Sequence, residues 1–524
     1  MIASCLLTAC SDEDGSGHTF RYTLLSDPQN LDPQMAEDLS SLNVISNIYT
    51  GLLRQTQTGG IECDACESYT VSADGLIYNF KIKEGIKWQT NAEFEAEMTA
   101  HDFVYGFKRL LSPNTGSPHA KKFYCIKNAQ AINTMGAPLD TLGVEALSDY
   151  ELRIELSSAN SDFLYLLTTP PSFPCNEEFF YFTKGKYGLN TNAVASNGPF
   201  YITSWLYDPY GKDNYLILRR NTSYNDANIV YPYAINYFIQ RNNPEKKLYD
   251  FTEGETDVVD YIGSDEDYLN EFAYKSYQTM SVGLVFNLEN ECMQYDEVRQ
   301  ALAMSLDMSV FEDLPRSLKK ATGLIPSEVS ILNKSFRELY AQPSAEEYNL
   351  SLAQLLWQSN LTLKERSSLD GTNILVPQSF EHFDILNDVV SQWQTGLQFY
   401  CGVEVLPDDE YEKRISEGKF VVALSYNTAD ENLPQRFFDN YVYGGLYRYQ
   451  IAELNQIITA AKLEYSLSKC ASYYSQAEKY MIDKNYYIPL FYQSEYLLIG
   501  EDITDVEYNP FTKCIKFEKA KCFD

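Results

Sequence analysis

The chain has 524 residues, of which 44% are hydrophobic and 22% are charged. This composition supplies a large core and excludes disorder along most of the chain, and the length predicts roughly three compact units or fewer large ones. The 73 acidic residues outnumber the 41 lysines and arginines by 32. Such an acidic chain repels phosphate backbones, so we expect no nucleic-acid partner.

The first segment has the order of an export signal and a tether. Residues 1–9 are apolar or small, and Leu7-Thr8-Ala9-Cys10 resembles the lipobox of bacterial lipoproteins, which implies a diacylated Cys10 and a membrane anchor. The polar residues 11–17 are typical of a flexible tether. A signal peptide also needs a basic start, so we expect the natural start to lie upstream. The alternative is an accidental match in a cytosolic protein.

In the first half of the chain, residues 19–25 favour a strand and residues 38–53 carry apolar side chains at helical spacing. Residues 78–83 alternate apolar and polar and predict a half-buried strand. Thr99-Ala100-His101-Asp102 resembles a capping box, and the helix that it starts should end at the turn-forming residues 113–118. Further strands are predicted at 152–156 and 216–220.

Cysteines and histidines give little support for metal or redox chemistry. Cys63-Asp64-Ala65-Cys66 is a lone CxxC in a loop before a predicted strand, not between a strand and a helix as in thioredoxin-like proteins. Disulfides are possible if the chain is exported, but the sequence assigns no pairing. The four histidines are scattered and form no HExxH motif, which argues against a zinc hydrolase.

The second half again mixes strands and helices. Apolar runs predict strands at 281–288, 420–425 and 488–499. Helical spacing predicts helices at 296–306, 384–397, 451–462 and 467–483. Since strands and helices do not alternate strictly, the class is α/β or α+β with more than one lobe. No 18-residue apolar run occurs, so a membrane-spanning helix is not expected.

Ordered motifs along the chain resemble one known family. They include Pro28-Gln29-Asn30-Leu31-Asp32-Pro33-Gln34, Gly85-Ile86-Lys87-Trp88, Thr99-Ala100-His101-Asp102-Phe103-Val104 and Asn197-Gly198-Pro199-Phe200. Arg109-Leu110-Leu111 followed by Pro113-Asn114-Thr115-Gly116-Ser117-Pro118 is typical of the oligopeptide branch. From about residue 19 to its end, the chain is similar to the family 5 solute-binding proteins of bacterial ABC importers (peptide and nickel type), above all to oligopeptide-binding proteins.

The resemblance implies an α/β fold of the periplasmic-binding-protein type (type II, large three-domain form), with two lobes and a hinge that closes over ligand. It also implies the division of the chain. The expected segments are a signal remnant, lipobox and tether (1–18), the first lobe (19–54, 195–281 and 488–524), a subdomain inserted in that lobe (55–194), and the second lobe (282–487).

A protein that binds peptides of any sequence must recognise main-chain amides, the α-ammonium and the carboxylate. In the family, the α-ammonium is bound by an Asp in an Ala-Asp-x-Asn-x-Pro stretch, and here Ala429-Asp430-Glu431-Asn432-Leu433-Pro434 matches it. Asp430 is therefore the leading ligand residue, with Ala429 beside it. The alternative is a loop aspartate that caps a helix starting near Pro434.

Other ligand contacts follow from the same resemblance. The family has a Trp where this chain has Asn427, so its stacking role falls to the neighbouring Tyr426 or the pocket takes another ligand. Glu431 either favours cationic ligands or, as we expect, is a solvated charge at the rim. Glu37-Asp38-Leu39 matches the segment that pairs with the ligand backbone, although it is also a plausible helix start. Tyr261 lies where the family lines the cleft.

The implied function is a monomeric extracytoplasmic receptor, anchored by lipid, that delivers oligopeptides to an ABC permease and needs no cofactor. The same scaffold could instead sense a signalling peptide or bind a non-peptide ligand such as a glycan. An enzyme is not expected, because the sequence has no nucleophile elbow with a Ser–His–Asp order, no metal cluster and no phosphate loop.

Overall fold

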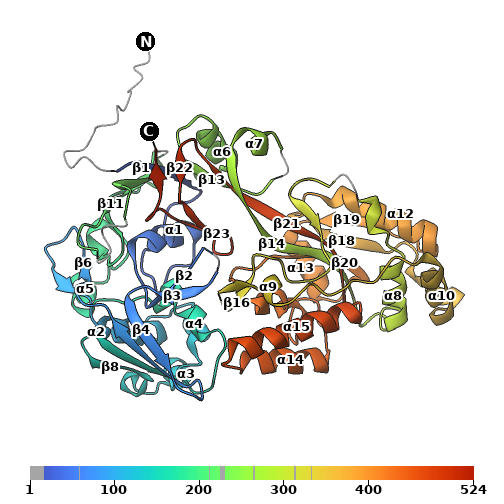
Figure 1. The fold of residues 1–524 in the computed structure, drawn as a ribbon, viewed down its shortest axis with the longest axis horizontal. Helices are drawn as coiled ribbons and strands as arrows, with labels where there is room; N and C mark the ends of the chain where they lie inside the picture. The colour runs from blue at the N-terminus through green and yellow to red at the C-terminus, as the bar shows by residue number, and fades with distance from the viewer. Residues whose placement is uncertain are drawn as a thin grey trace, which may run out of the picture.

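Long strands join two lobes in the structure, a computed structural model of the chain (Figure 1). The structure describes residues 17–57, 59–211, 213–224, 230–263, 266–311, 314–331 and 333–523. The predicted lipobox with Cys10 lies outside the described residues. We call the described residues of 17–272 and 500–523 the first lobe and those of 287–486 the second lobe. Both lobes contain helices and strands, which confirms the α/β class and the two-lobed architecture.

A four-stranded sheet is the base of the first lobe. Its order is β1-β12-β11-β10, and β1 is parallel to β12 whereas the other neighbours are antiparallel. In β11, Leu216 and Leu218 are buried and Ile217 between them is half-buried, which is the period of two expected of a strand with one covered face. The strands are β1 (Thr19–Leu24), β10 (Phe200–Leu206), β11 (Tyr215–Arg220) and β12 (Ala234–Ile239).

Helix α1 (Leu39–Ile48) packs on this sheet, where Asn47 Nδ2 donates a hydrogen bond to the Tyr237 hydroxyl at 3.1 Å. The helix begins after Asp38, whose carboxylate accepts a hydrogen bond from the Ser41 N–H at 2.8 Å. It is shorter than the predicted helix over 38–53, because the backbone becomes extended at Tyr49 and residues Leu53–Gln55 form strand β2.

A second, antiparallel sheet in the order β4-β5-β9-β8 forms a subdomain with helices on one side (Figure 1). The predicted capping box is present, since the Thr99 N–H donates to the Asp102 carboxylate at 2.8 Å. The elements are β4 (Cys66–Val71), β5 (Ile77–Ile82), β8 (Val144–Ser148), β9 (Glu151–Glu155), α2 (Ala100–Leu111), α3 (Ala129–Met135), α4 (Phe163–Leu166) and α5 (Glu177–Phe182).

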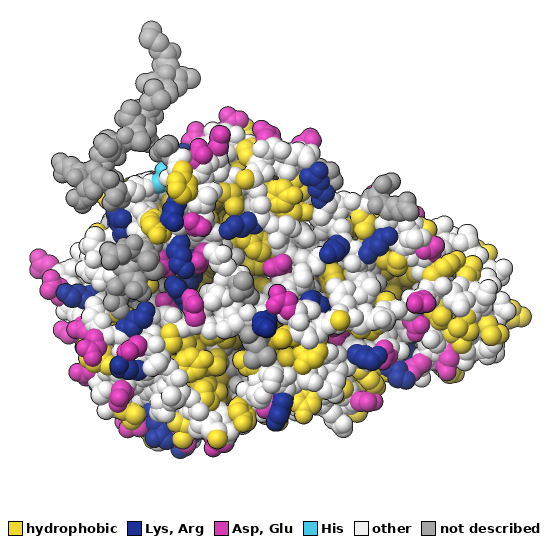
Figure 2. All heavy atoms as spheres, in the orientation of Figure 1, with side chains coloured by type: hydrophobic (Ala, Val, Ile, Leu, Met, Phe, Trp, Pro, Cys, Tyr) yellow, Lys and Arg dark blue, Asp and Glu magenta, His cyan; other side chains and the backbone are white. Residues whose placement is uncertain are grey.

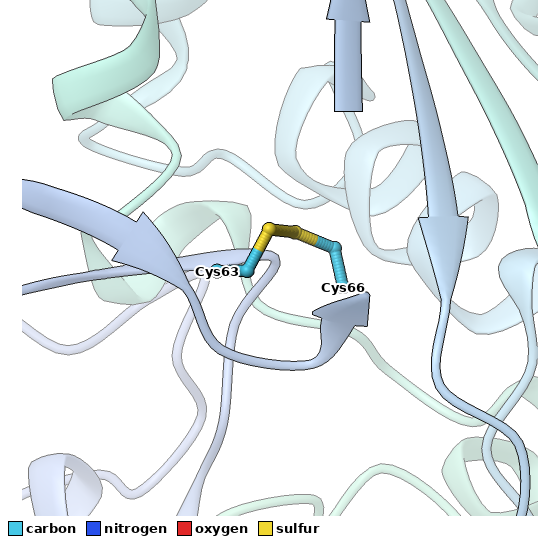
Figure 3. Close-up of a disulfide and its surroundings, with 2 residues drawn as sticks. All are labelled: Cys63 and Cys66. Atoms are coloured by element: carbon cyan, nitrogen blue, oxygen red, sulfur yellow. A yellow bond between two sulfur atoms is a disulfide. The ribbon is translucent and has the colours of Figure 1, made fainter. Parts of the chain in front are cut away.

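The two cysteines of the CxxC segment are bonded to each other. Cys63, at the end of strand β3 (Ile61–Cys63), and Cys66, at the start of β4, form a disulfide with their Cα atoms 5.2 Å apart (Figure 3). Strand β3 pairs with β2, so the bond fixes the passage from this hairpin into the subdomain sheet. The sequence left the pairing of the cysteines open, and the structure assigns this pair.

Two long strands connect the lobes. Strands β14 (Ala273–Phe286) and β21 (Tyr487–Ile499) are antiparallel neighbours in a seven-stranded sheet of order β13-β21-β14-β20-β18-β19, with β15 on β21. At one end β21 pairs with β13 (Val258–Tyr261) of the first lobe, and at the other β14 pairs with β20 (Val422–Asn427) of the second lobe. Because both strands cross from one lobe to the other, we call them the hinge strands.

Helices cover both faces of the sheet in the second lobe. In β18 (Asn373–Pro377), Ile374 and Val376 pack with one cluster of helices, and Leu375 packs with the opposite cluster. The four helices predicted in this half are confirmed to within two residues at each end. The main helices are α8 (Asp296–Met304), α10 (Leu350–Asn360) and α12 (Leu386–Leu397) on one face, and α13 (Asp408–Ser416), α14 (Ala452–Lys462) and α15 (Leu467–Asp483) on the other.

Shorter elements complete the chain. They are β6 (Lys87–Trp88), β7 (Ala96–Glu97), α6 (Pro244–Thr252), α7 (Glu266–Glu271), β15 (Leu318–Lys320), β16 (Ser330–Ile331), β17 (Lys334–Ser335), α9 (Phe336–Leu339), α11 (Leu363–Leu369), β19 (Gly402–Leu406), β22 (Ile503–Thr504), β23 (Glu507–Asn509), β24 (Cys514–Lys516) and β25 (Lys521–Cys522).

Candidate ligand-binding site

Segments from both lobes line one cavity of about 610 Å³, which we call the interlobe cavity. The first lobe contributes one face of α1, the β2–β3 turn, residues 168–173 and the C-terminal residues 507–516. The second lobe contributes residues 327–338 and Asn432, and the hinge strand β14 contributes Tyr277. A volume of this size is typical of small-ligand sites, which hold roughly 300–1,000 Å³.

The walls of the interlobe cavity combine aromatic rings with a few charged groups. Phe173 and Phe511 give apolar surface, and the rings of Tyr277 and Tyr508 meet edge to face with centroids 5.3 Å apart. Burial raises the pKa of the cavity residue Glu328 above the ordinary value of a glutamate. On the face shown in Figure 2, basic side chains lie interspersed among acidic and apolar ones.

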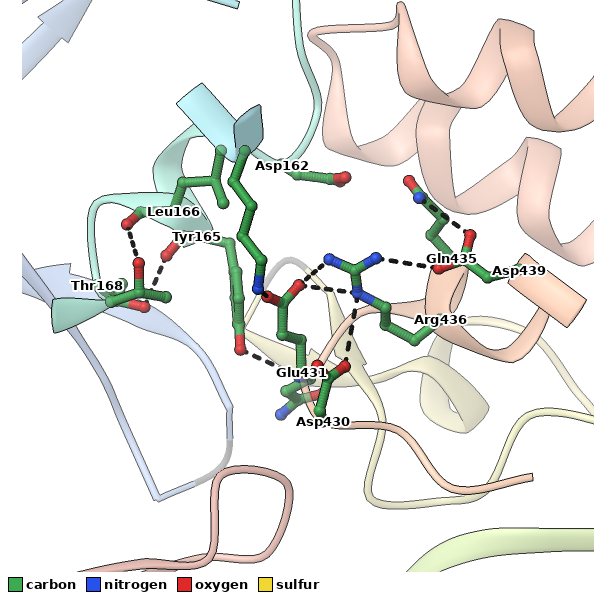
Figure 4. A network of polar contacts seen from close by, with 12 residues as sticks. Asp162, Tyr165, Leu166, Thr168, Asp430, Glu431, Gln435, Arg436 and Asp439 are labelled. Atoms are coloured by element: carbon green, nitrogen blue, oxygen red, sulfur yellow. Dashed lines mark hydrogen bonds and ion pairs between the residues drawn. The ribbon is translucent and has the colours of Figure 1, made fainter. Parts of the chain in front are cut away.

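Asp430, the predicted ammonium ligand, lies in the loop after β20 and is 79% exposed (Figure 4). Its carboxylate is 3.9 Å from Nε of Arg436. The alternative capping role is not formed, because the short 3₁₀ helix Pro434–Phe437 has Leu433 as its N-cap and no side-chain cap. Asp430 stands two residues before Asn432, which lines the interlobe cavity.

The neighbouring Glu431 corrects our expectation of a solvated rim charge. Its side chain is only 6% exposed, and its carboxylate accepts hydrogen bonds from Lys122 Nζ at 2.7 Å and from Arg436 Nε at 2.8 Å (Figure 4). Burial alone would raise the pKa of Glu431, but the charges of Arg436 and Lys122 hold that pKa below its ordinary value. With two cations on one carboxylate, Glu431 offers little net negative potential to a ligand.

The other residues predicted here, two at the end of β20 and one in the loop after it, are largely buried. Asn427 donates a hydrogen bond from Nδ2 to the Phe437 carbonyl at 3.1 Å, so it holds the loop in place. The Tyr426 hydroxyl donates to Met280 Sδ at 3.0 Å, and Ala429 is buried. These three residues shape the loop that presents Asp430, and a direct ligand contact by any of them stays a prediction.

The predicted contacts of the first lobe lie in two places. Asp38 caps α1, while Glu37 and Leu39 are exposed at the start of that helix, one turn before the cavity residue Leu42. Tyr261, at the end of β13, packs against Tyr268 and Tyr496, with ring centroids 5.7 and 6.5 Å away. It is not among the described residues that line the interlobe cavity.

The sequence did not predict three of the residues that line the cavity: Tyr277, Glu328 and Tyr508. Tyr277 lies in the outer part of β14, where half-buried and exposed residues give no apolar run. Glu328 lies in a turn and Tyr508 in the three-residue strand β23, and neither segment is long enough to show a periodic pattern. The cavity lining thus joins segments that are more than 200 residues apart, and no local signal marks them.

Two further properties of the described part of the chain concern membrane spans and metal sites. No helix there combines the length and the apolar character that crossing a bilayer needs. Within the same residues, histidine, cysteine, aspartate and glutamate form no group of three or more placed to hold a metal ion.

Comparisons with known proteins agree with this architecture. The model of the bacterial extracellular solute-binding proteins, family 5, matches residues 60–447. The dipeptide-binding protein of Lactococcus lactis subsp. cremoris and the oligopeptide-binding protein OppA of Bacillus subtilis are each 25% identical to the chain, and each match covers 97% of the chain and 95% of the relative. The solved unliganded open form of the periplasmic murein tripeptide-binding protein MppA has a TM-score of 0.79 at 20% identity, with 97% of each chain covered. The chain belongs to the family 5 bacterial extracellular solute-binding proteins.

Proposed function

We propose that this chain is an extracytoplasmic, lipid-anchored binding protein that captures oligopeptides between its two lobes and delivers them to an ABC permease. The observation that carries the proposal is the interlobe cavity, whose walls come from both lobes and from a hinge strand. A ligand in that position contacts both lobes at once and therefore favours the closed arrangement over the open one. The names of the two relatives above support a peptide as that ligand.

Asp430 is the residue that we propose for the peptide α-ammonium. It is exposed, it lies 3.9 Å from the Arg436 guanidinium, and it stands two residues before the cavity residue Asn432. A carboxylate held this loosely can exchange its contact with Arg436 for an ammonium group when the lobes close. Residues Glu37-Asp38-Leu39 at the start of α1 lie one turn from the cavity and are proposed to meet the peptide backbone.

The anchor and the partners complete the proposal. Leu7-Thr8-Ala9-Cys10 supports lipidation at Cys10, which would hold a monomeric receptor at the extracytoplasmic face of the membrane, next to its permease. We propose the predicted segment boundaries for the lobes and the subdomain, and a role in transport without catalysis.

Native mass spectrometry of protein purified without refolding tests the ligand. We expect a ladder of bound masses that fragment into peptides, and these masses should disappear after partial unfolding and dialysis. Recovery of one defined peptide species would favour the sensor of a signalling peptide. Recovery of a glycan or another non-peptide mass would overturn the peptide assignment and leave the binding-protein fold intact.

A further inference from the structure

Two cationic side chains line the interlobe cavity, and both face carboxylates of the protein itself. Arg337 Nη1 donates to the buried carboxylate of Glu478 at 2.8 Å. Lys516 lies near Asp64 and Glu518, where burial raises the pKa of both carboxyl groups and the charge of Lys516 opposes that rise. Neither cation is therefore left to attract an acidic ligand.

The acidic side chains that line the cavity have fewer cationic partners within the protein. Glu507 is paired with Lys519 at 3.3 Å. Glu328 is half-buried and Glu338 is exposed, and neither forms an ion pair with a described lysine or arginine. Burial raises the pKa of Glu328, and a hydrogen bond with the backbone of Gln278 opposes only part of that rise. A partly desolvated carboxylate without a cationic partner is costly. A cation supplied by the ligand would remove this cost.

Aromatic rings lie next to that carboxylate. Tyr277 and Glu328 line the same cavity, and the Glu328 N–H donates to the carbonyl of Gln278, the residue after Tyr277, at 3.4 Å. Burial and, next, the charge of Glu328 raise the pKa of Tyr277 to about 12. Tyr508 packs against Tyr277 and lines the same cavity. Tyrosine faces accept the aliphatic stem of a lysine or arginine side chain and attract its charged end.

We propose that the interlobe cavity selects peptides that carry a lysine or arginine side chain, with Glu328 as the counter-ion and the Tyr277–Tyr508 pair as the wall for the stem. The inference rests on the proposed function, since it names the class of peptide that this site takes. It differs from a general attraction of cations by the acidic chain, because it assigns the preference to one carboxylate and to one position of the peptide.

Calorimetric titration of the wild-type protein with alanine di- to hexapeptides tests the preference. Each position in turn carries lysine, the uncharged isostere norleucine, Nε-acetyl-lysine or glutamate. At one position, lysine should bind about tenfold more tightly than norleucine or acetyl-lysine, the difference expected of one charge-assisted hydrogen bond, and glutamate should bind least. Acetyl-lysine removes the charge from the ligand, so this arm does not depend on any variant.

The variant Glu328→Gln keeps the shape of the side chain and removes its charge. It should bind norleucine peptides like the wild type and lose the tenfold preference for lysine. The control is Glu412→Gln, which changes the net charge by the same amount at an exposed position of α13, outside the cavity. It should retain the full preference.

The outcomes separate the two claims. If no peptide of the series binds and none co-purifies, the proposed function fails. If peptides bind but lysine, norleucine and acetyl-lysine bind equally at every position, peptide binding stands and the selectivity is overturned. The assignment to Glu328 is overturned if Glu328→Gln discriminates as well as the wild type, or if Glu412→Gln loses the preference to the same extent.

Discussion

Lys122 of the subdomain and Glu431 of the second lobe form an ion pair that connects the two lobes, with Nζ and Oε1 2.7 Å apart. Beside it, the Asn432 N–H donates to the Tyr165 hydroxyl at 3.3 Å. The loop that presents Asp430 is therefore tied to the first lobe in this arrangement. Any movement of one lobe against the other must turn about this contact or break it.

The first prediction concerns this pair. Lys122→Met should lower the free energy of unfolding by about 1 kcal/mol, a modest loss because Lys122 is 44% exposed and its charge is screened. Glu431→Gln should lower the free energy of unfolding further, since it also removes one of the carboxylate partners of the half-buried Arg436. In urea unfolding, the double variant should lose less free energy of unfolding than the two single variants lose together. If the losses are additive, the two side chains are not coupled.

Two controls sharpen that test. Lys127→Met breaks an exposed pair with Glu155 in the same subdomain and should change stability by no more than about 0.5 kcal/mol. The pKa of Glu431 is lowered in the folded protein, so its ion pairs stabilise above the unfolded pKa of about 4.3. The effect of Lys122→Met should therefore shrink as the pH falls through the lower, folded pKa.

The second prediction concerns Glu495 in the hinge strand β21. This residue is fully buried, and burial raises its pKa to about 7 although Lys513 forms an ion pair with it. The folded protein therefore holds a proton that the unfolded chain has released between about pH 4.3 and pH 7. By linkage, this group makes the protein less stable as the pH rises through that window, by a few kcal/mol in all.

Glu495→Gln should remove this part of the pH dependence. The free energy of unfolding in urea should differ less between about pH 5 and about pH 7 for the variant than for the wild type. The exposed Glu412→Gln should behave like the wild type. An unchanged pH dependence in Glu495→Gln would mean that the carboxyl group ionises at its ordinary pKa in the hinge.

How far the sequence predicts this structure depends on how local each signal is. Helix α15 (Leu467–Asp483) follows from its own amphipathic pattern over 17 residues. Strand β14 begins eight residues before its predicted start, because its outer part lacks the apolar run of the inner part. Glu431 was expected to be solvated, because its partner Lys122 lies 309 residues earlier and no neighbouring residue in the sequence indicates the contact. The family motifs led to the Asp430 loop, whereas the cavity residues Tyr277 and Glu328 follow only from the folded arrangement.

The third prediction concerns anchoring. Expressed with an upstream signal sequence, the protein should partition into the detergent phase, and Cys10→Ser should move it to the aqueous phase. Two acyl chains suffice for stable anchoring, since each buried CH₂ contributes about 0.8 kcal/mol. Cys5→Ser, in the same N-terminal segment, is the matched control and should remain in detergent. Equal partitioning of the wild type and Cys10→Ser would contradict the lipobox.

The last prediction concerns Asp430 and the peptide α-ammonium. If closure buries this pair, loss of one partner leaves an unpaired charge and costs roughly 3–5 kcal/mol, which is about two to four decades in affinity. Asp430→Asn should therefore weaken binding of a free-amine peptide, and N-acetylation of the peptide should weaken binding to the wild type equally. The variant should lose little more on acetylation, because both changes report one interaction.

Calorimetric titration of the four combinations of protein and peptide gives the coupling energy directly. Asp439→Asn is the matched control for Asp430→Asn, since Asp439 also pairs with Arg436, at 3.0 Å, but lies beyond the proposed ammonium site. It should leave the discrimination between free and acetylated peptides intact. If Asp430→Asn binds free-amine peptides as tightly as the wild type, the ammonium is held elsewhere. If neither protein distinguishes the two peptides, the site does not recognise an α-ammonium group. A non-peptide ligand then becomes the better assignment for the interlobe cavity.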